Sequence, residues 1–176
     1  MADPASPTGV EASSGVDVVV SDEQTEMAID APRWAALAAA VLRREGAHGE
    51  LTLTFVDRAE IAALNREHMG EDGPTDVLSF PLDAGDAYGD HLVGPVLLGD
   101  VVVCPAVAAE AAPSHAGTVD DELALLTVHG VLHVLGHDHA EPDEARLMRA
   151  REIELLSELH WHGGPPAGFV HEQGAS

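Results

Sequence analysis

Three histidines in the spacing His-x3-His-x5-His place the strongest constraint on how this chain can fold. His129, His133 and His139 lie in the run HGVLHVLGHDH, at the end of the apolar stretch ELALLTVHGVLHVLG. This stretch is strongly apolar over about four helical turns, so we predict a buried helix. His129 and His133, four residues apart, then lie on one face of that helix. Gly136 predicts the end of the helix and a reversal of the backbone that brings His139 back toward the first two rings.

Three imidazoles in this arrangement are typical of a zinc site with an open fourth position, where the metal can activate a bound water. His137 is a competing third ligand, but it directly follows Gly136, so we favour His139. Asp138 is a candidate catalytic residue that either accepts a hydrogen bond from a ligand N–H or is simply a turn residue. The alternative to a metal site is a set of core histidines bonded to backbone carbonyls. We expect one zinc ion, although nickel and cobalt fit the same ligands.

The same spacing matches the metzincin metalloprotease pattern at all but one position. Those proteases carry a glutamate directly after the first histidine, where it acts as the general base. This chain has Gly130 there, which cannot accept a proton. The sequence therefore predicts the metal ligands without the peptidase base.

Length and composition limit the remaining possibilities. The 176 residues suffice for one packed domain but not for two ordinary ones. Cys104 is the only cysteine, so no intramolecular disulfide can form and a reducing cytoplasm is expected. The chain has no stretch of about 20 apolar residues, so we expect no membrane span. The net charge of −23, with eight basic residues that are all arginine, argues against broad affinity for naked nucleic acid but not against one local RNA site.

Hydrophobic periodicity predicts a single α+β domain with a small mixed four-stranded sheet packed with about five helices. We expect the metal-site helix to end at Gly136 and to begin at Thr118 or Asp120, and Asp57 to cap an earlier helix. The expected organisation is a disordered N-terminal extension at 1–15, the domain at 16–160 and a flexible C-terminal tail at 161–176. The predicted strands are 16–20, 50–57, 76–82 and 96–104. The predicted helices are 31–46, 58–68, 118–136 and 141–159, with a short helix within 104–117 that is interrupted or ends near Pro113.

Two motifs together resemble the YbeY-type endoribonucleases, also called rRNA maturation factors. The run HGVLHVLGHDH matches that family's signature His-Gly-x-Leu-His-Leu-x-Gly-x-Asp-His, except that Val134 replaces a leucine. The upstream segment LNREHMGEDGPTDVLSFP is also similar, and LLGDVVVC resembles the family's Gly-Asp strand. The resemblance covers about residues 16–160 in the same order of elements.

The resemblance implies a single-domain α+β fold with a zinc site at His129, His133 and His139, in the bacterial cytoplasm. It also implies a single-strand-specific endoribonuclease that acts in maturation of the 3′ end of the small-subunit (16S) rRNA and in ribosome quality control. The implied partners are ribosomal RNA, the small ribosomal subunit and a ribosomal-protein or assembly-factor partner, with no membrane.

One departure from the family affects the expected RNA contact. Many members carry an arginine, implicated in activity, where this chain has Met69, and a methionine cannot bind a phosphate. Arg66, three residues earlier, is our candidate catalytic substitute, and the alternative is a solvated surface arginine. Thr75, Asp76 and Ser79 are either substrate-groove groups or ordinary turn and strand residues.

Two other functions stay open at the level of sequence. One is a zinc hydrolase of another substrate class, which Gly130 disfavours. The other is a ribosome-assembly factor with a structural metal and little cleavage activity, which Met69 and the net charge of −23 leave open. The general base is also open: metal-bound hydroxide, Asp138, a substrate phosphate oxygen or a distant residue.

Overall fold

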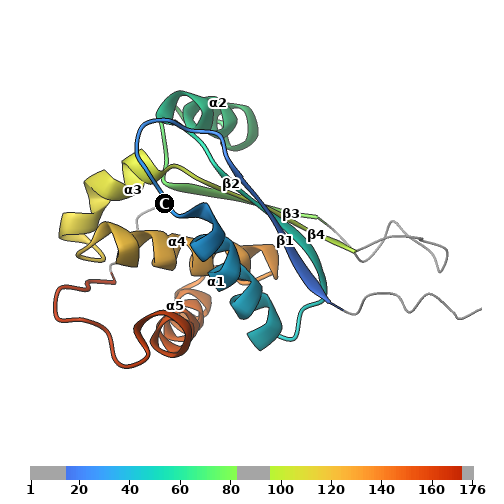
Figure 1. The fold of residues 1–176 in the computed structure, drawn as a ribbon, viewed down its shortest axis with the longest axis vertical. Coiled ribbons are helices and arrows are strands. Elements are labelled where there is room, and N and C mark those ends of the chain that lie inside the picture. Colours follow the sequence, from blue (N-terminus) through green and yellow to red (C-terminus); the bar gives the residue numbers. More distant parts are fainter. Residues whose placement is uncertain (1–14, 83–95, 172–176) are drawn as a thin grey trace, which may run out of the picture.

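The computed structural model describes residues 15–82 and 96–171, which form one mixed sheet and five α-helices (Figure 1). The predicted fold class is confirmed. The N-terminal extension predicted for 1–15 lies, apart from its last residue, outside the described residues. The strands are β1 (Val16–Asp22), β2 (Gly49–Phe55), β3 (Val77–Pro81) and β4 (Leu97–Val103). The helices are α1 (Ala31–Arg44), α2 (Arg58–Met69), α3 (Pro105–Ala111), α4 (Val119–Val134) and α5 (Pro142–Leu156), with a 3-10 turn η1 (Ala112–Ser114) after α3 and a π-helical turn η2 (Ser157–Trp161) after α5.

The sheet has the strand order β1-β2-β4-β3. Strands β1, β2 and β4 run parallel, and β3 pairs antiparallel with β4. Alternation along β4 sends Val101 and Val103 to one face and Val102 to the other, and all three side chains are buried. Burial on both faces requires helices on both sides of the sheet at this strand.

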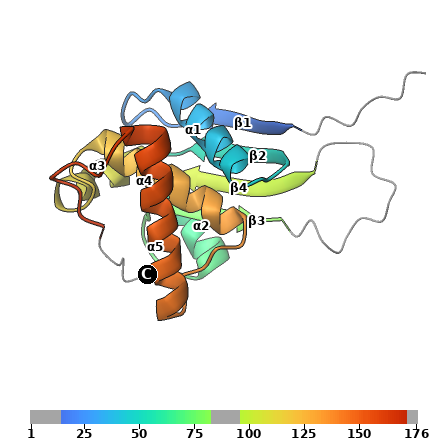
Figure 2. The same cartoon turned by 90° about the horizontal axis from the view of Figure 1, so that it is seen from below.

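Helices α1, α4 and α5 lie on one side of the sheet, and α2 lies on the other (Figures 1 and 2). The larger hydrophobic cluster fills the space between the sheet and helices α1, α4 and α5. A smaller cluster of Val56, Ile61, Leu78, Val102, Cys104 and Ala106 includes residues of α2, β3 and β4. In the part of the chain that the structure describes, no helix is long and apolar enough to cross a membrane.

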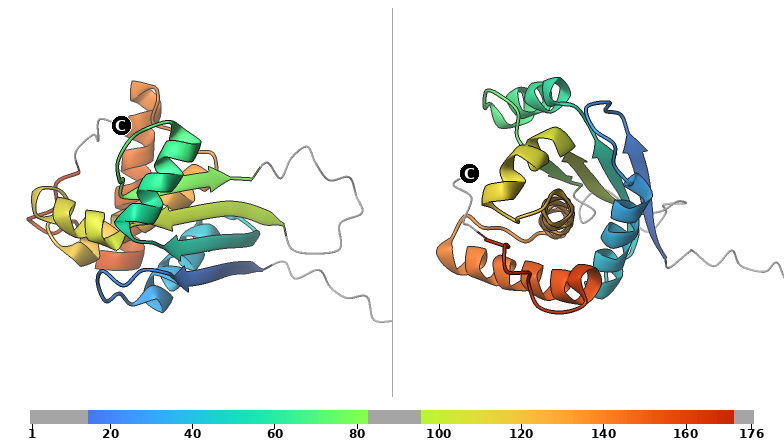
Figure 3. Two further views of the ribbon diagram at one scale, coloured as in Figure 1. Left: turned by 90° about the horizontal axis from the view of Figure 1, so that it is seen from above. Right: turned by 60° about the vertical axis from the view of Figure 1, so that its left-hand side comes forward.

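Helix α4 is the central element of the domain. The right-hand view of Figure 3 shows it nearly end-on, enclosed by the sheet, α1, α3 and α5. A helix that is apolar around most of its circumference must be covered on most sides, as this one is. Its buried apolar residues include Leu123, Ala124, Leu125, Leu126, Val128, Val131, Leu132 and Val134.

Both ends of α4 follow the sequence signals. The Thr118 hydroxyl accepts a hydrogen bond from the Asp121 N–H at 3.1 Å, so Thr118 is the N-cap. At the other end, the Gly136 N–H donates to the His133 carbonyl and the His137 N–H to the Leu132 carbonyl, each at 3.0 Å. These two bonds, with Gly136 in the left-handed region at φ 99°, form a Schellman motif. Gly136 thus ends the helix as predicted, and Val134 is its last helical residue.

Gly130 sets how closely α4 approaches the sheet. A Cβ atom at this position would lie 2.5 Å from Val101 Cγ1 and 3.4 Å from Ser79 Oγ. The Ser79 hydroxyl also donates a hydrogen bond of 3.2 Å to the Gly130 carbonyl. The helix backbone therefore lies directly against β3 and β4, with no space for a side chain between them.

We predict that Gly130→Ala destabilises the domain, although the intrinsic helix propensity of alanine is more favourable than that of glycine by about 1 kcal/mol. The added methyl group overpacks the contact with Val101, at an expected cost of about 1–3 kcal/mol in the free energy of unfolding. Urea unfolding measures the change. Gly164→Ala is the control, because nothing lies within 4 Å of that Cβ position, and we expect a change within about 0.5 kcal/mol. A Gly130→Ala protein as stable as the wild type would contradict the close packing.

Candidate metal centre

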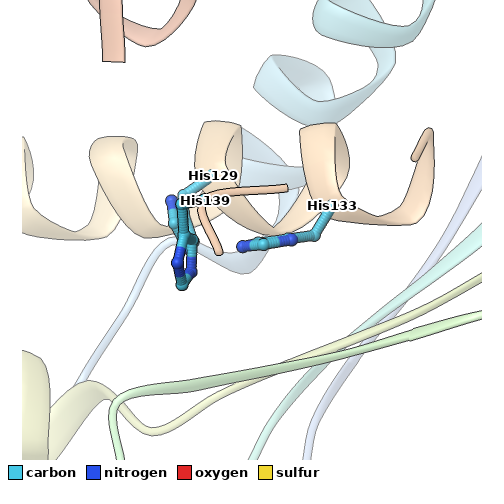
Figure 4. Close-up of side chains that lie close together, drawn as sticks. All are labelled: His129, His133 and His139. Atoms are coloured by element: carbon cyan, nitrogen blue, oxygen red, sulfur yellow. The ribbon is translucent and has the colours of Figure 1, made fainter. Parts of the chain in front are cut away.

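Three imidazoles converge at the end of α4 (Figure 4). His129 and His133 lie one turn apart on the helix with ring centroids 4.5 Å apart. The ring centroid of His139, from the loop after α4, lies 4.8 Å from that of His133 and 5.6 Å from that of His129. One ring nitrogen from each histidine lies within 4.8 Å of the others, so the group could hold one ion. The structure brings the predicted ligands together, and metal binding by them stays a prediction.

The loop after Gly136 separates the two candidates for the third ligand. The Asp138 carboxylate accepts a hydrogen bond of 2.7 Å from the His139 N–H. In this contact Asp138 is an exposed turn residue that supports the loop carrying His139. His137 Nε2 instead lies 3.7 Å from a carboxylate oxygen of Glu45, and His137 is not part of the imidazole group.

A buried carboxylate from α5 orients His129. Glu152 Oε1 lies 2.5 Å from His129 Nδ1, and its Oε2 lies 2.6 Å from His171 Nε2. Burial alone would raise the pKa of Glu152, but the hydrogen bonds from His129 and His171 outweigh it and lower this pKa to about 2. An ionised carboxylate only accepts, so His129 Nδ1 carries the proton. The lone pair of His129 Nε2 is then left for a metal.

His133 is also suited to coordination. Burial, followed by the nearby charges of His129 and His139 when protonated, lowers the pKa of His133 to about 4. The ring is therefore neutral near pH 7, as a metal ligand must be. Three imidazoles, one of them oriented by a carboxylate, are a donor set that fits zinc and related first-row ions.

The imidazole group opens into a cavity of about 890 Å³. One side is formed by α4, the loop that follows it and α5, with the three histidines, Arg149 and Glu152. Residues of α2, β3 and the loop between them form the other side. This second set is Asn65, Met69, Glu71, Thr75, Asp76, Val77, Leu78, Ser79 and Pro81.

Thr75, Asp76 and Ser79 all line the cavity, as residues of a substrate groove must. Their hydrogen bonds, however, serve the turn and strand. The Asp76 carboxylate accepts from the Val77 N–H at 2.8 Å, and Ser79 bonds to the Gly130 carbonyl. The three residues therefore shape the cavity wall and also face its interior.

The two arginines near this region differ in position. Arg66 has a side chain that is 76% exposed and pairs with Asp72 at 3.1 Å, and it does not line the cavity. Its catalytic role stays a prediction. Arg149, on α5, is the only arginine among the described residues that line the cavity. Met69 also lines it, at the end of α2.

Sequence reasoning missed Glu152, Arg149 and His171. A signal for Glu152 was present, because it falls on the apolar face of α5 with Met148 and Leu155, where a charge implies a buried partner. The other two carry no comparable local signal, since each reaches the cavity only through the tertiary fold.

A single α+β domain whose central helix carries a His-x3-His pair into an open cavity has a site that could hold a metal ion, as small metal-dependent enzymes do. The family described as Endoribonuclease YbeY matches residues 19–160. The chain belongs to this family, which confirms the identification made from the two motifs. The expected assignment as an enzyme of the endoribonuclease class is confirmed with it.

Similar proteins support the same membership. A protein of Salinispora tropica named Endoribonuclease YbeY is 52% identical over an alignment of 116 residues, and the match covers 61% of this chain and 73% of that protein. One of the same name from Beutenbergia cavernae is 47% identical over 140 residues, covering 78% of this chain and 93% of the relative. The solution structure of TM1509 from Thermotoga maritima has a TM-score of 0.58 at 25% identity, covering 82% of this chain and 90% of that one.

We predict about one divalent ion per chain, bound through His129, His133 and His139. Each single alanine variant of these three should lose the ion, because two imidazoles hold it more weakly than three. His137→Ala is the matched control and should retain it, because His137 faces Glu45. Elemental analysis after dialysis measures the content. Loss of metal from His137→Ala, with full retention by His139→Ala, would reverse the choice of third ligand.

Proposed function

We propose that this chain is a zinc-dependent, single-strand-specific endoribonuclease of the cytoplasm that acts in maturation of the 3′ end of 16S rRNA and in ribosome quality control. The observation that carries the proposal is the group of three imidazoles opening into a cavity of about 890 Å³. Relatives named Endoribonuclease YbeY, at up to 52% identity, support the choice of RNA as the substrate.

The residues at this centre have different roles. When bound, a zinc ion would polarise a phosphoryl oxygen and activate a water. His129, His133 and His139 would hold it, and Glu152 keeps the proton of His129 on Nδ1. The open cavity leaves room for a phosphodiester beside the imidazoles.

The position of Gly130 disfavours a peptidase of the metzincin type. A glutamate there would collide with Val101, so the usual peptidase base cannot be accommodated. Among the described residues that line the cavity, the carboxylates are Glu71, Asp76 and Glu152. Glu152 is already shared by two imidazoles, so Glu71 and Asp76 are the carboxylates left to take up a proton from the attacking water. Asp138, which does not line the cavity, is less well placed for this role.

Arg149 is better placed than Arg66 to contact the scissile phosphate. A guanidinium stabilises the negative charge that develops on a phosphoryl group during cleavage. Arg149 lines the same cavity as the three histidines, whereas Arg66 lies outside it and pairs with Asp72. We infer that Arg149 provides the positive charge that the family arginine, absent at Met69, would otherwise supply.

The decisive test is cleavage of single-stranded RNA by the purified, metal-loaded chain. We expect endonucleolytic products from RNA and none from casein. His133→Ala, purified in parallel, should lose cleavage, and His137→Ala should retain it. Equal cleavage by the wild type and His133→Ala would show a contaminating ribonuclease and contradict the proposal. Cleavage of casein alone would support a zinc hydrolase of another class.

Variants of the two arginines separate their roles. Arg149→Ala should lower RNA turnover by about tenfold or more, because one charge-stabilising donor is lost, with metal content unchanged. Arg149→Lys should restore only part of it, since lysine lacks the planar fork. If Arg66 carries the contact instead, Arg66→Ala will lower turnover, Met69→Arg will raise it, and Arg149→Ala will leave it unchanged.

We further propose that the chain acts on the small ribosomal subunit, with a ribosomal-protein or assembly-factor partner. A net charge of −23 repels a phosphate backbone over most of the surface, so attraction must come from a local site or a partner. Small-subunit particles should therefore be cut faster than their extracted RNA, and cleavage of the latter should increase at low salt. Deletion of the gene should leave unprocessed 16S rRNA ends. Equal rates on particles and extracted RNA, with normal ends in the deletion strain, would contradict this proposal.

A further inference from the structure

The C-terminal segment, residues 163–171, returns from η2 to the metal-site cavity. Figure 1 shows it as the red trace that leaves the end of α5 and turns back toward α3 and α4. The Val170 N–H donates a hydrogen bond of 2.7 Å to the His115 carbonyl. The Phe169 ring packs edge-on against Trp161, with centroids 4.8 Å apart. The backbone of Gly168 lies so close to Gly117 that a Cβ on Gly117 would approach the Gly168 carbonyl oxygen to 2.9 Å.

These contacts attach the segment to the start of α4. The Trp161 indole N–H donates to the Asp121 carboxylate at 2.8 Å, and His160 Nε2 lies at the same distance from the same oxygen. Asp121 belongs to the first turn of α4. The segment therefore packs on elements that the central helix already holds in place. We expected residues 161–176 to be a flexible tail, and the described part of that range has these defined contacts.

His171 is the residue of this segment that enters the cavity. Its Nε2 lies 2.6 Å from Glu152 Oε2, while Glu152 Oε1 lies 2.5 Å from His129 Nδ1. The side chains of His171 and Glu152 are 16% and 2% exposed, respectively. A continuous chain of hydrogen bonds thus joins the C-terminal segment to one of the three imidazoles. The family match ends at residue 160, so His171 lies outside the matched residues.

A buried carboxylate needs partners for both of its oxygens. Without His171, Glu152 Oε2 would lose this hydrogen bond, which disfavours a charge held in a largely buried position. The carboxylate could also rotate to find other partners, because one hydrogen bond does not fix its plane. With both bonds in place, the orientation of Oε1 toward His129 is fixed. A group that is hydrogen-bonded to a metal ligand orients that ligand and thereby changes the affinity of the site for the metal.

We propose that His171 is a positioning residue of the metal centre, which fixes the Glu152 carboxylate so that His129 presents Nε2 to the ion. This inference rests on the proposed function, in which the three histidines bind a divalent ion. It assigns the segment 163–171 a role at the site, as the part of the chain that delivers the second partner of Glu152.

The test is the binding of Co²⁺ and Zn²⁺ to the full chain. The metal-free protein is titrated with Co²⁺, whose visible absorption reports the coordination geometry. Zn²⁺ affinity is measured by competition with a chromophoric chelator. The variants are His171→Ala, His171→Gln, Glu152→Gln and the double variant of Glu152→Gln with His171→Ala. Val170→Ala is the matched control, because it removes an exposed neighbour and leaves the backbone bond to His115 intact.

We expect Glu152→Gln to weaken Zn²⁺ binding by about 10- to 100-fold, as is typical of a ligand's hydrogen-bond partner. His171→Ala, one bond further from the ion, should weaken it by up to about tenfold and change the Co²⁺ spectrum. His171→Gln should recover most of the affinity, since its amide can donate to Glu152 Oε2. The double variant should bind no more weakly than Glu152→Gln, because His171 acts through Glu152. Val170→Ala should match the wild type.

Three outcomes would overturn the inference. The first is a His171→Ala protein with wild-type affinity and an unchanged Co²⁺ spectrum. The second is an equal loss in Val170→Ala and His171→Ala, which would indicate general loosening of the segment. The third is a wild type whose Co²⁺ binding is absent or insensitive to His133→Ala, and that result would also remove the metal centre itself. The first two outcomes leave the proposed function standing, so the two failures are distinguishable.

Discussion

The packing of α4 against the sheet at Gly130 is the contact on which the rest of this structure depends. Because no side chain separates the helix from Val101, the helix lies deep in the domain, and α1, α3 and α5 cover much of the rest of its surface. The depth of α4 in the domain fixes where the side chains of His129 and His133 enter the cavity. It also removes the position from which a metzincin supplies its base. One glycine therefore determines both the placement of two predicted ligands and the chemistry that is unavailable to them.

The sequence was most informative where the determining interactions are local. The helix around His129, its cap at Thr118 and its end at Gly136 follow from signals within a few residues of each other. The strands were also placed within about two residues, because alternation of apolar and polar residues, or a short apolar run bounded by turn residues, predicts a strand from local sequence. The short helix after Cys104 was expected to be interrupted or to end near Pro113, and it ends at Ala111, where the 3-10 turn containing Pro113 follows it.

The rest of the site could not be predicted because it depends on contacts between distant parts of the chain. Glu152 meets His129 across 23 residues, and this contact depends on how α5 crosses α4. The two arginines illustrate the same limit. Arg66 was chosen for its distance along the sequence from Met69, yet its side chain is on the surface with Asp72, whereas Arg149 reaches the cavity from another helix. Spacing along the chain is a guide to position only within one element.

The hydrogen-bond chain through Glu152 also has a consequence for synthesis of the protein. His129 lies in the middle of the domain, but the second partner of Glu152 is residue 171. A nascent chain still attached to the translating ribosome can form α4 and gather the three histidines before residue 171 emerges. The buried carboxylate acquires both partners only when the segment that follows α5 has left the exit tunnel. Assembly of the centre with both partners of Glu152 is thus delayed until the segment that follows α5 has been synthesised and has folded back onto the start of α4.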